Sequence, residues 1–87
     1  MENKVLIKLI VPELDTSFDV FIPVNEFIWR IKKLLMKSVS DLTNTPFSNQ
    51  LDFVLINKED STLYRDNDLI INTDIRNGSE LIFLSKR

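Results

Sequence analysis

One long amphipathic segment limits the folds open to this chain more than any other feature. From Asn25 to Leu42, apolar residues recur at spacings of three and four, which gathers them on one side of an α-helix. Asn25 is expected to cap this helix, and Glu26 to complement its dipole. A helix with one apolar side must bury it against another element, here predicted to be a sheet. The residues expected on that side are Phe27, Ile28, Ile31, Leu34, Leu35, Val39 and Leu42.

Strand-like alternation occurs both before and after the helix. The residues of Lys4–Val11 are mostly β-branched or leucine, and Pro12 to Thr16 separates them from a second alternating run, which predicts a hairpin. A single helical turn is expected at 72–75, with Ile75 in the core. The expected strands are 4–11, 17–22, 51–56, a short one at 62–64, and 79–85. The side chains expected to face the helix are Val5, Ile7, Leu9, Val11, Phe18, Val20, Ile22, Leu51, Phe53, Leu55, Leu81 and Phe83.

This order of elements predicts an α+β fold of the ubiquitin-like β-grasp type, with a mixed four- to five-stranded sheet packed on one long helix. In such a fold the first and last strands are parallel neighbours, joined by right-handed crossovers through the helix. The helix covers one face of the sheet only, so the strands should alternate and the other face should be wet. A chain of 87 residues supplies one core of modest size, which predicts a single domain over residues 1–87.

The composition argues against several classes of function. The chain has no cysteine and no histidine, so thiolate and imidazole chemistry and structural zinc sites are not expected, and no cofactor is predicted. The acidic groups at 59–60 and 66–68 do not match the spacing of a calcium loop. No apolar stretch approaches the ~20 residues that span a bilayer, and the first residues lead into a strand pattern. We therefore expect a non-enzymatic, cytoplasmic protein that does not insert into membranes.

The face of the sheet away from the helix carries more apolar residues than a simple solvated face requires. Leu6, Val54 and Ile82 come from three strands that are adjacent in the expected order, and their clustering would form a protein-binding patch. The alternative is that these are scattered surface residues with high β-propensity. The outward apolar residues are Leu6, Ile10, Phe21, Val54, Ile56 and Ile82.

A second candidate surface lies on the helix. Trp29 and Met36 are seven residues apart, so they are expected together on the side away from the core, as an aromatic and thioether anchor for a protein partner. The alternative is that the loop over residues 43–50 covers Trp29 and makes it part of the core.

Charge is distributed unevenly around the helix and the later loops. The outer side of the helix is basic, whereas residues 59–80 are rich in carboxylates, and this asymmetry can orient docking or simply keep both surfaces hydrated. The net charge of -2 and the lack of an aromatic platform on a strand argue against nucleic acid as a partner.

The C-terminal third of the chain carries a family resemblance. Ile75–Leu84, with Gly78 at a turn and Leu81 and Phe83 after it, resembles the ending of many ubiquitin-like domains. More particularly, Val54–Lys58, followed by Leu69–Ile75 and then Asn77-Gly78, is similar to the YukD/EsaB group of bacterial ubiquitin-like proteins, which is associated with type VII (WXG100) secretion systems.

The resemblance implies a non-enzymatic accessory or regulatory protein that binds other proteins, with secretion-system membrane or ATPase components as candidate partners. It leaves the oligomeric state open. The alternative is a conjugated modifier or a sulfur carrier, which needs a flexible Gly-Gly end. The sequence ends in Leu84-Ser-Lys-Arg and contains one glycine, so this alternative requires a natural chain that continues further.

Overall fold

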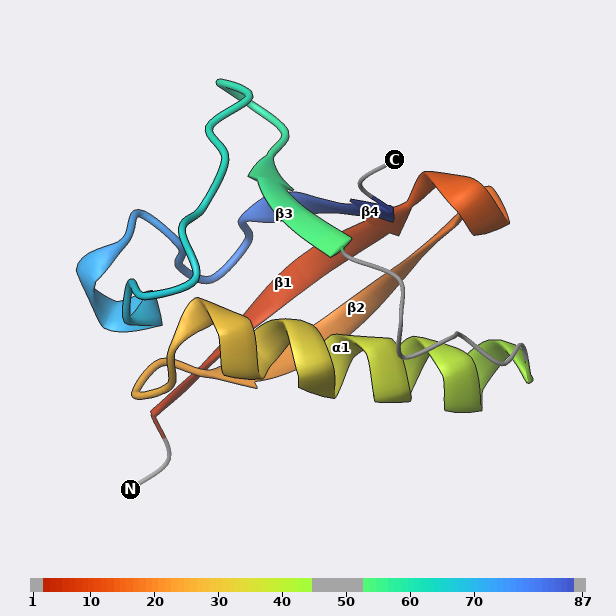
Figure 1. Ribbon diagram of the computed structural model, residues 1–87, viewed down its shortest axis with the longest axis horizontal. Coiled ribbons are helices and arrows are strands. Elements are labelled where there is room, and N and C mark those ends of the chain that lie inside the picture. The colour runs from red at the N-terminus through yellow and green to blue at the C-terminus, as the bar shows by residue number, and fades with distance from the viewer. Residues whose placement is uncertain (1–2, 45–52, 86–87) are drawn as a thin grey trace.

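One long helix lies across one face of a four-stranded sheet, as Figure 1 shows. The computed structural model describes residues 3–44 and 53–85. The elements are β1 (Lys4–Val11), η1 (Pro12–Leu14), β2 (Thr16–Pro23), α1 (Ile28–Thr43), β3 (Phe53–Asn57), η2 (Ile70–Asn72) and β4 (Glu80–Ser85).

The strand order β2-β1-β4-β3 confirms the expected topology. β1 and β2 form an antiparallel hairpin, β1 and β4 are parallel neighbours, and β3 pairs with β4 antiparallel. The short strand expected at 62–64 is reduced to one isolated bridge between Leu63 and Ile56. The sheet is therefore mixed and four-stranded, with one bridging residue beyond β3.

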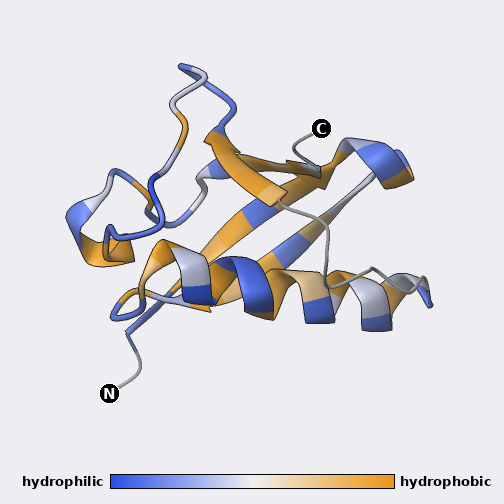
Figure 2. Cartoon of the chain, in the orientation of Figure 1, coloured by the Kyte–Doolittle hydropathy of each residue, from blue (hydrophilic) through white to orange (hydrophobic). Residues whose placement is uncertain are grey.

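The core lies between α1 and the sheet, and its residues alternate along each strand as predicted. Leu9, Leu81, Phe83 and Leu55 are fully buried and come from three strands of the sheet. The rings of Phe53 and Phe83 stack with their centroids 4.5 Å apart. Figure 2 shows the same division on α1, which is polar on its outer side and apolar toward the sheet. Burial of these apolar side chains is the main force that holds the helix to the sheet.

The helix begins two residues later than the sequence suggested, because backbone contacts replace the predicted cap. Phe27 rather than Asn25 is the N-cap residue, and the Phe27 side chain forms no capping hydrogen bond. Instead the backbone N–H of Ile28 donates to the carbonyl of Asp68 (2.9 Å), and that of Trp29 to the carbonyl of Asp66 (3.2 Å). A loop distant in sequence thus satisfies donors that a capping side chain normally takes.

The apolar stripe of α1 is narrower than predicted. Its buried residues are Ile28, Ile31, Leu35 and Val39. The prediction was wrong for Phe27, Leu34 and Leu42, which are 42 %, 43 % and 64 % exposed. A sheet contacts a helix along a stripe, and residues at its margins stay in contact with solvent even when their spacing fits the repeat.

The turns before β4 differ from the prediction in position but not in kind. The helical turn is at Ile70–Asn72, two residues before the expected start, while Ile75 is buried as predicted. Gly78 has φ 89°, in the left-handed region, which supports its expected place in a turn. The predictions for Leu51 and for the 43–50 loop over Trp29 fall largely on residues outside the described part.

Candidate protein-binding surface

The outer face of the sheet, opposite α1, carries a row of apolar side chains that crosses the strands. Ile10 on β1 pairs with Ile82 on β4, and Ile82 pairs with Ile56 on β3. Leu63 continues the row through its bridge to Ile56. Residues that pair directly across strands point to the same face, so these four side chains are neighbours.

A second pair widens this row. Val54 lies two residues before Ile56 on β3 and pairs with Leu84, two residues after Ile82 on β4, so both side chains point to the same face as the row. These side chains are half-buried, except that of Leu63, which is 55 % exposed. We call this surface the sheet-face patch, and it consists of Ile10, Val54, Ile56, Leu63, Ile82 and Leu84.

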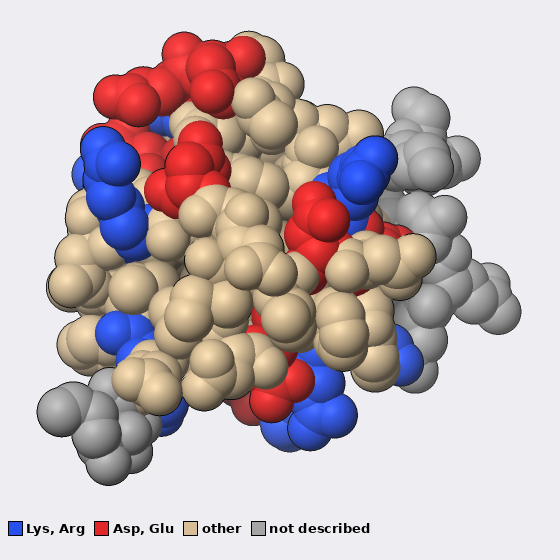
Figure 3. Space-filling view, turned by 90° about the vertical axis from the view of Figure 1, so that its left-hand side faces the viewer, with Lys and Arg blue, Asp and Glu red and all other residues tan. Residues whose placement is uncertain are grey.

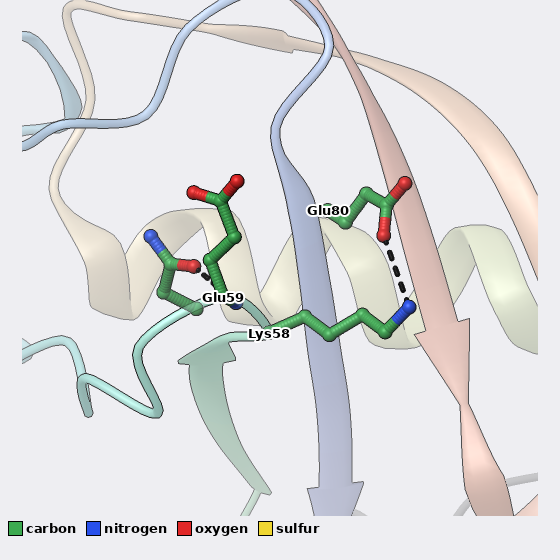
Figure 4. A network of polar contacts seen from close by, with 4 residues as sticks. Lys58, Glu59 and Glu80 are labelled. Atoms are coloured by element: carbon green, nitrogen blue, oxygen red, sulfur yellow. Dashed lines mark hydrogen bonds and ion pairs between the residues drawn. The ribbon is translucent and has the colours of Figure 1, made fainter.

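A row of charged residues borders the sheet-face patch on one side. Lys8 pairs with Asp19 on β2 and with Glu80 on β4. Lys58 follows β3 and binds Glu80 through an ion pair of 3.2 Å between Nζ and Oε1. Figure 4 shows Lys58 reaching across β4 toward Glu80, with α1 behind the strands. The signs alternate across the sheet, so the row has little net charge and stays hydrated, and its exposed ion pair contributes little stability.

This charged row places Leu6 outside the patch. Val54 and Ile82 both belong to the sheet-face patch, as predicted from the strand order. Leu6 instead pairs with Phe21, on the far side of Lys8, and lies four residues from Ile10 on β1, about 13 Å away. The prediction of one contiguous patch with Leu6 was wrong, because strand order does not determine the stagger between strands.

Trp29 and Met36 do not form one exposed anchor. Trp29 is 40 % exposed. Met36 is partly buried and packs against the core, so its expected place on the side away from the core was wrong. The cause is visible at Lys32, on the same flank of α1, whose ammonium donates to the carbonyl of Phe53 on β3 (3.0 Å). That flank therefore lies close to β3, while the binding role of Trp29 and Met36 stays a prediction.

Two members of the sheet-face patch were missed from the sequence. Leu84 alternates with Ile82 and was therefore identifiable by the same period of two. Leu63 gave no such signal, because its place depends on the single bridge to Ile56.

A polar hollow of about 400 Å³ lies near the end of β3, beside Tyr64. Asn57 and Asp74 line it and both hydrogen-bond to the hydroxyl of Tyr64, which donates to Asp74 Oδ1 at 2.6 Å. Burial, together with this hydrogen bond, raises the pKa of Tyr64 well above its usual range. The hydroxyl is therefore protonated at neutral pH and is not poised to act as a base or nucleophile.

Within residues 3–44 and 53–85, no cluster of carboxylates is arranged to hold a metal ion. In the same residues, no helix has both the length and the apolar character needed to cross a bilayer.

Comparison with known proteins gives shape similarity without close sequence similarity. No family model matches the chain, and no curated protein matches it. Many solved structures resemble it, including the three that follow. A chain of the "MycP5-free ESX-5 inner membrane complex, State II" matches with a TM-score of 0.80 and 13 % identity, over 97 % of this chain and 21 % of that one. The ubiquitin-like domain of Plasmodium falciparum Dsk2 gives 0.73 and 13 %, over 95 % and 99 %.

The third is the ubiquitin-like domain of Arabidopsis thaliana protein At2g32350, with a TM-score of 0.67 and 17 % identity over 98 % of this chain and 80 % of that chain. The fold is the ubiquitin-like β-grasp. At these identities the similarity establishes the fold alone, and the β-grasp chain spans about a fifth of the ESX-5 chain.

Proposed function

We propose that this β-grasp domain is a non-enzymatic protein–protein interaction module that binds through the sheet-face patch, as an accessory or regulatory component of a type VII (WXG100) secretion system. Its partners in this proposal are membrane or ATPase components of that system, and it works on the cytoplasmic side. The observation that carries the binding role is the sheet-face patch itself.

The physical case for binding rests on the position of the patch. Its members meet across β1, β4 and β3, on the face that α1 does not cover. Contiguous apolar surface on a small domain is costly to leave in water, and such patches mark interaction sites. The charged row through Lys8 and Glu80 provides a polar rim, the usual boundary of a protein interface.

The case for a secretion role is supported by two similarities. The residues at 54–58, 69–75 and 77–78 resemble the YukD/EsaB group. The fold also matches a domain-sized part of a chain in an ESX-5 inner membrane complex. Neither similarity names the partner, so the experiment below must identify it.

The test is affinity capture of the tagged protein from its own host, comparing Ile82→Asp with Leu6→Asp. Both changes place one negative charge on the outer face of the sheet, but Leu6 lies beyond the charged row. We expect the wild type and Leu6→Asp to recover a secretion membrane or ATPase component, and Ile82→Asp to lose it. Far-UV circular dichroism must show that both variants are folded.

Three results would contradict the proposal. Equal loss of the partner in both variants would indicate that the patch has no special role. A ladder of covalently enlarged forms would indicate conjugation. Recovery of no secretion component by the wild type would remove the secretion role, although a different partner lost only in Ile82→Asp would still support the patch.

A further inference from the structure

An exposed aromatic pair lies at the start of α1, on the other side of the sheet from the sheet-face patch. The rings of Phe27 and Trp29 are nearly parallel, with an angle of 12° between their planes and centroids 6.5 Å apart. Phe27 is 42 % exposed and Trp29 40 % exposed, which is unusual for two large aromatic side chains in so small a domain.

The backbone holds this pair in place. Phe27 forms an isolated bridge with Leu69, and the N–H of Trp29 donates to the carbonyl of Asp66. The rings therefore start from a fixed backbone, and binding a partner would require little ordering of the chain. A preorganised surface retains more of its contact energy as affinity.

The charge beside the rings is unbalanced. Lys33 follows Trp29 by one helical turn, and its Nζ lies 5.5 Å from the centre of the indole ring. In the part of the chain that the structure describes, no carboxylate pairs with Lys33, whereas each acidic side chain around the start of α1 has a cation. The pairs are Glu26 with Arg30 (3.6 Å), Asp66 with Lys32 (2.6 Å) and Asp68 with Arg65 (4.0 Å).

Phe27, Trp29 and Lys33 therefore form an apolar surface with one positive charge that is not neutralised by a described carboxylate, on a protein whose net charge is -2. Figure 3 faces the end of the molecule where α1 begins and shows a broad uncharged area with charged side chains around it. A suitable partner would carry a carboxylate next to apolar side chains. Its carboxylate would pair with Lys33, and its apolar side chains would pack on the rings of Phe27 and Trp29.

We propose that Phe27, Trp29 and Lys33 form a second docking surface, which binds an acidic, apolar segment of another protein. This goes beyond the function proposed above, because α1 and the sheet-face patch lie on opposite sides of the sheet. The domain can then hold two partners at once and act as a bridge between them. Truncating an aromatic anchor or reversing the charge of Lys33 should weaken only the partner on the helix side.

The experiment begins with a random peptide library displayed on phage and selected on the immobilised full chain. Selection is repeated on Lys33→Glu and on Lys37→Glu. Lys37 is the matched control, because it lies one turn further along α1, carries the same charge and is paired with Asp41 at 3.7 Å. We expect peptides retained by Lys37→Glu and lost by Lys33→Glu to combine Asp or Glu with Leu, Ile or Phe.

The strongest such peptide is then synthesised and titrated against the fluorescence of Trp29, the only tryptophan in the chain. We expect Phe27→Ala and Lys33→Glu each to weaken binding by about tenfold or more, and added salt to weaken it further. A neutral version of the peptide, with Gln and Asn in place of Glu and Asp, should bind the wild-type protein weakly. Its affinity should be about as low as that of the acidic peptide for Lys33→Glu. Denaturant unfolding of each variant confirms that it is folded.

Several results would overturn this inference. Selected peptides without acidic residues, equal losses in Lys33→Glu and Lys37→Glu, or no change in Trp29 fluorescence would each exclude the proposed surface. Peptide binding should persist in Ile82→Asp, so a failure of the sheet-face patch and a failure of this surface are separately visible. Peptides lost only in Ile82→Asp would belong to the sheet-face patch and would not count as support here.

Discussion

Replacing Tyr64 with Phe tests whether the loops before β4 are held as the structure shows. Tyr64 is 7 % exposed, and its backbone N–H donates to the carbonyl of Leu55 on β3. Its hydroxyl donates to Asp74 Oδ1 (2.6 Å) and accepts from Asn57 Nδ2 (3.1 Å), so it links three segments of the chain. Tyr64→Phe keeps the buried ring and removes only these two hydrogen bonds.

The expected loss of stability near neutral pH is about 1.5 kcal/mol. A hydrogen bond to a charged group contributes roughly 1.5 to 3 kcal/mol. Asp74 is exposed, and Asn57 Nδ2 still donates to its other carboxylate oxygen (3.2 Å), so water and the amide compensate for part of the loss. The lower end of the range is therefore the appropriate magnitude.

The same network predicts how stability changes at alkaline pH. Burial and the Asp74 hydrogen bond raise the pKa of Tyr64 above its ordinary value, so the folded state holds the proton more tightly than the unfolded chain. Below the unfolded pKa of about 10, the contribution is fully present. Above it, only the unfolded chain releases this proton, and stability falls by up to about 1.4 kcal/mol per pH unit until the folded pKa is reached.

The assay is urea unfolding of wild type and Tyr64→Phe, followed by the fluorescence of Trp29, near pH 7 and between about pH 9 and 11. Every other ionisable side chain is the same in both proteins, so the difference between the two slopes isolates Tyr64. Because Tyr64 is the only tyrosine, near-ultraviolet absorbance also reports its ionisation directly. An ordinary pKa in the folded protein, or identical alkaline slopes for the two proteins, would refute the reasoning.

Four further substitutions test the register and the turn before β4. Phe83→Ala should cost about 3 to 5 kcal/mol in urea unfolding because it removes a buried ring, while Ile82→Asp, on the opposite face, should cost about 1 kcal/mol. The reverse order would mean that the register is wrong. Gly78→Ala should cost about 1 to 2 kcal/mol because φ is 89°, and no atom lies near enough to clash with the new methyl group; an unchanged midpoint would contradict that account. Asn77→Ala should cost about 1 kcal/mol through loss of the bond from the Leu6 N–H to Asn77 Oδ1 (2.8 Å), with Asn77→Asp as the control that keeps the acceptor.

Periodicity was sufficient for the inward residues of the strands. Leu9, Leu55 and Phe83 alternate with outward neighbours, and each is buried as expected. Side chains along a strand point alternately to its two faces, so only one of two alternating sets of residues can face the helix. The set that is apolar is the one that faces it. The same reasoning succeeded less well for α1, where Leu34 and Leu42 fit the spacing yet stay exposed. Spacing defines an angle around the helix, but the width of the contact depends on the sheet.

The candidate binding surface shows the same limit. Val54 and Ile82 were identified from alternation, and both lie in the sheet-face patch. Leu6 was included because β1 is next to β4, yet the parallel pairing aligns Ile10 with Ile82. Stagger between strands depends on the turn at 76–79, where Gly78 donates to the carbonyl of Leu6 (2.8 Å), and no local pattern predicts that contact.

The sequence by itself determined the order of the elements, the faces of the strands and the existence of a helix with one apolar side. These follow from local spacing, because side-chain direction repeats every two residues in a strand and every 3.6 in a helix. The tertiary structure alone decided where α1 begins and which apolar residues join into the sheet-face patch. Each of these depends on segments distant in the chain, such as the 66–69 loop whose carbonyls replace a helix cap, and only packing brings them together.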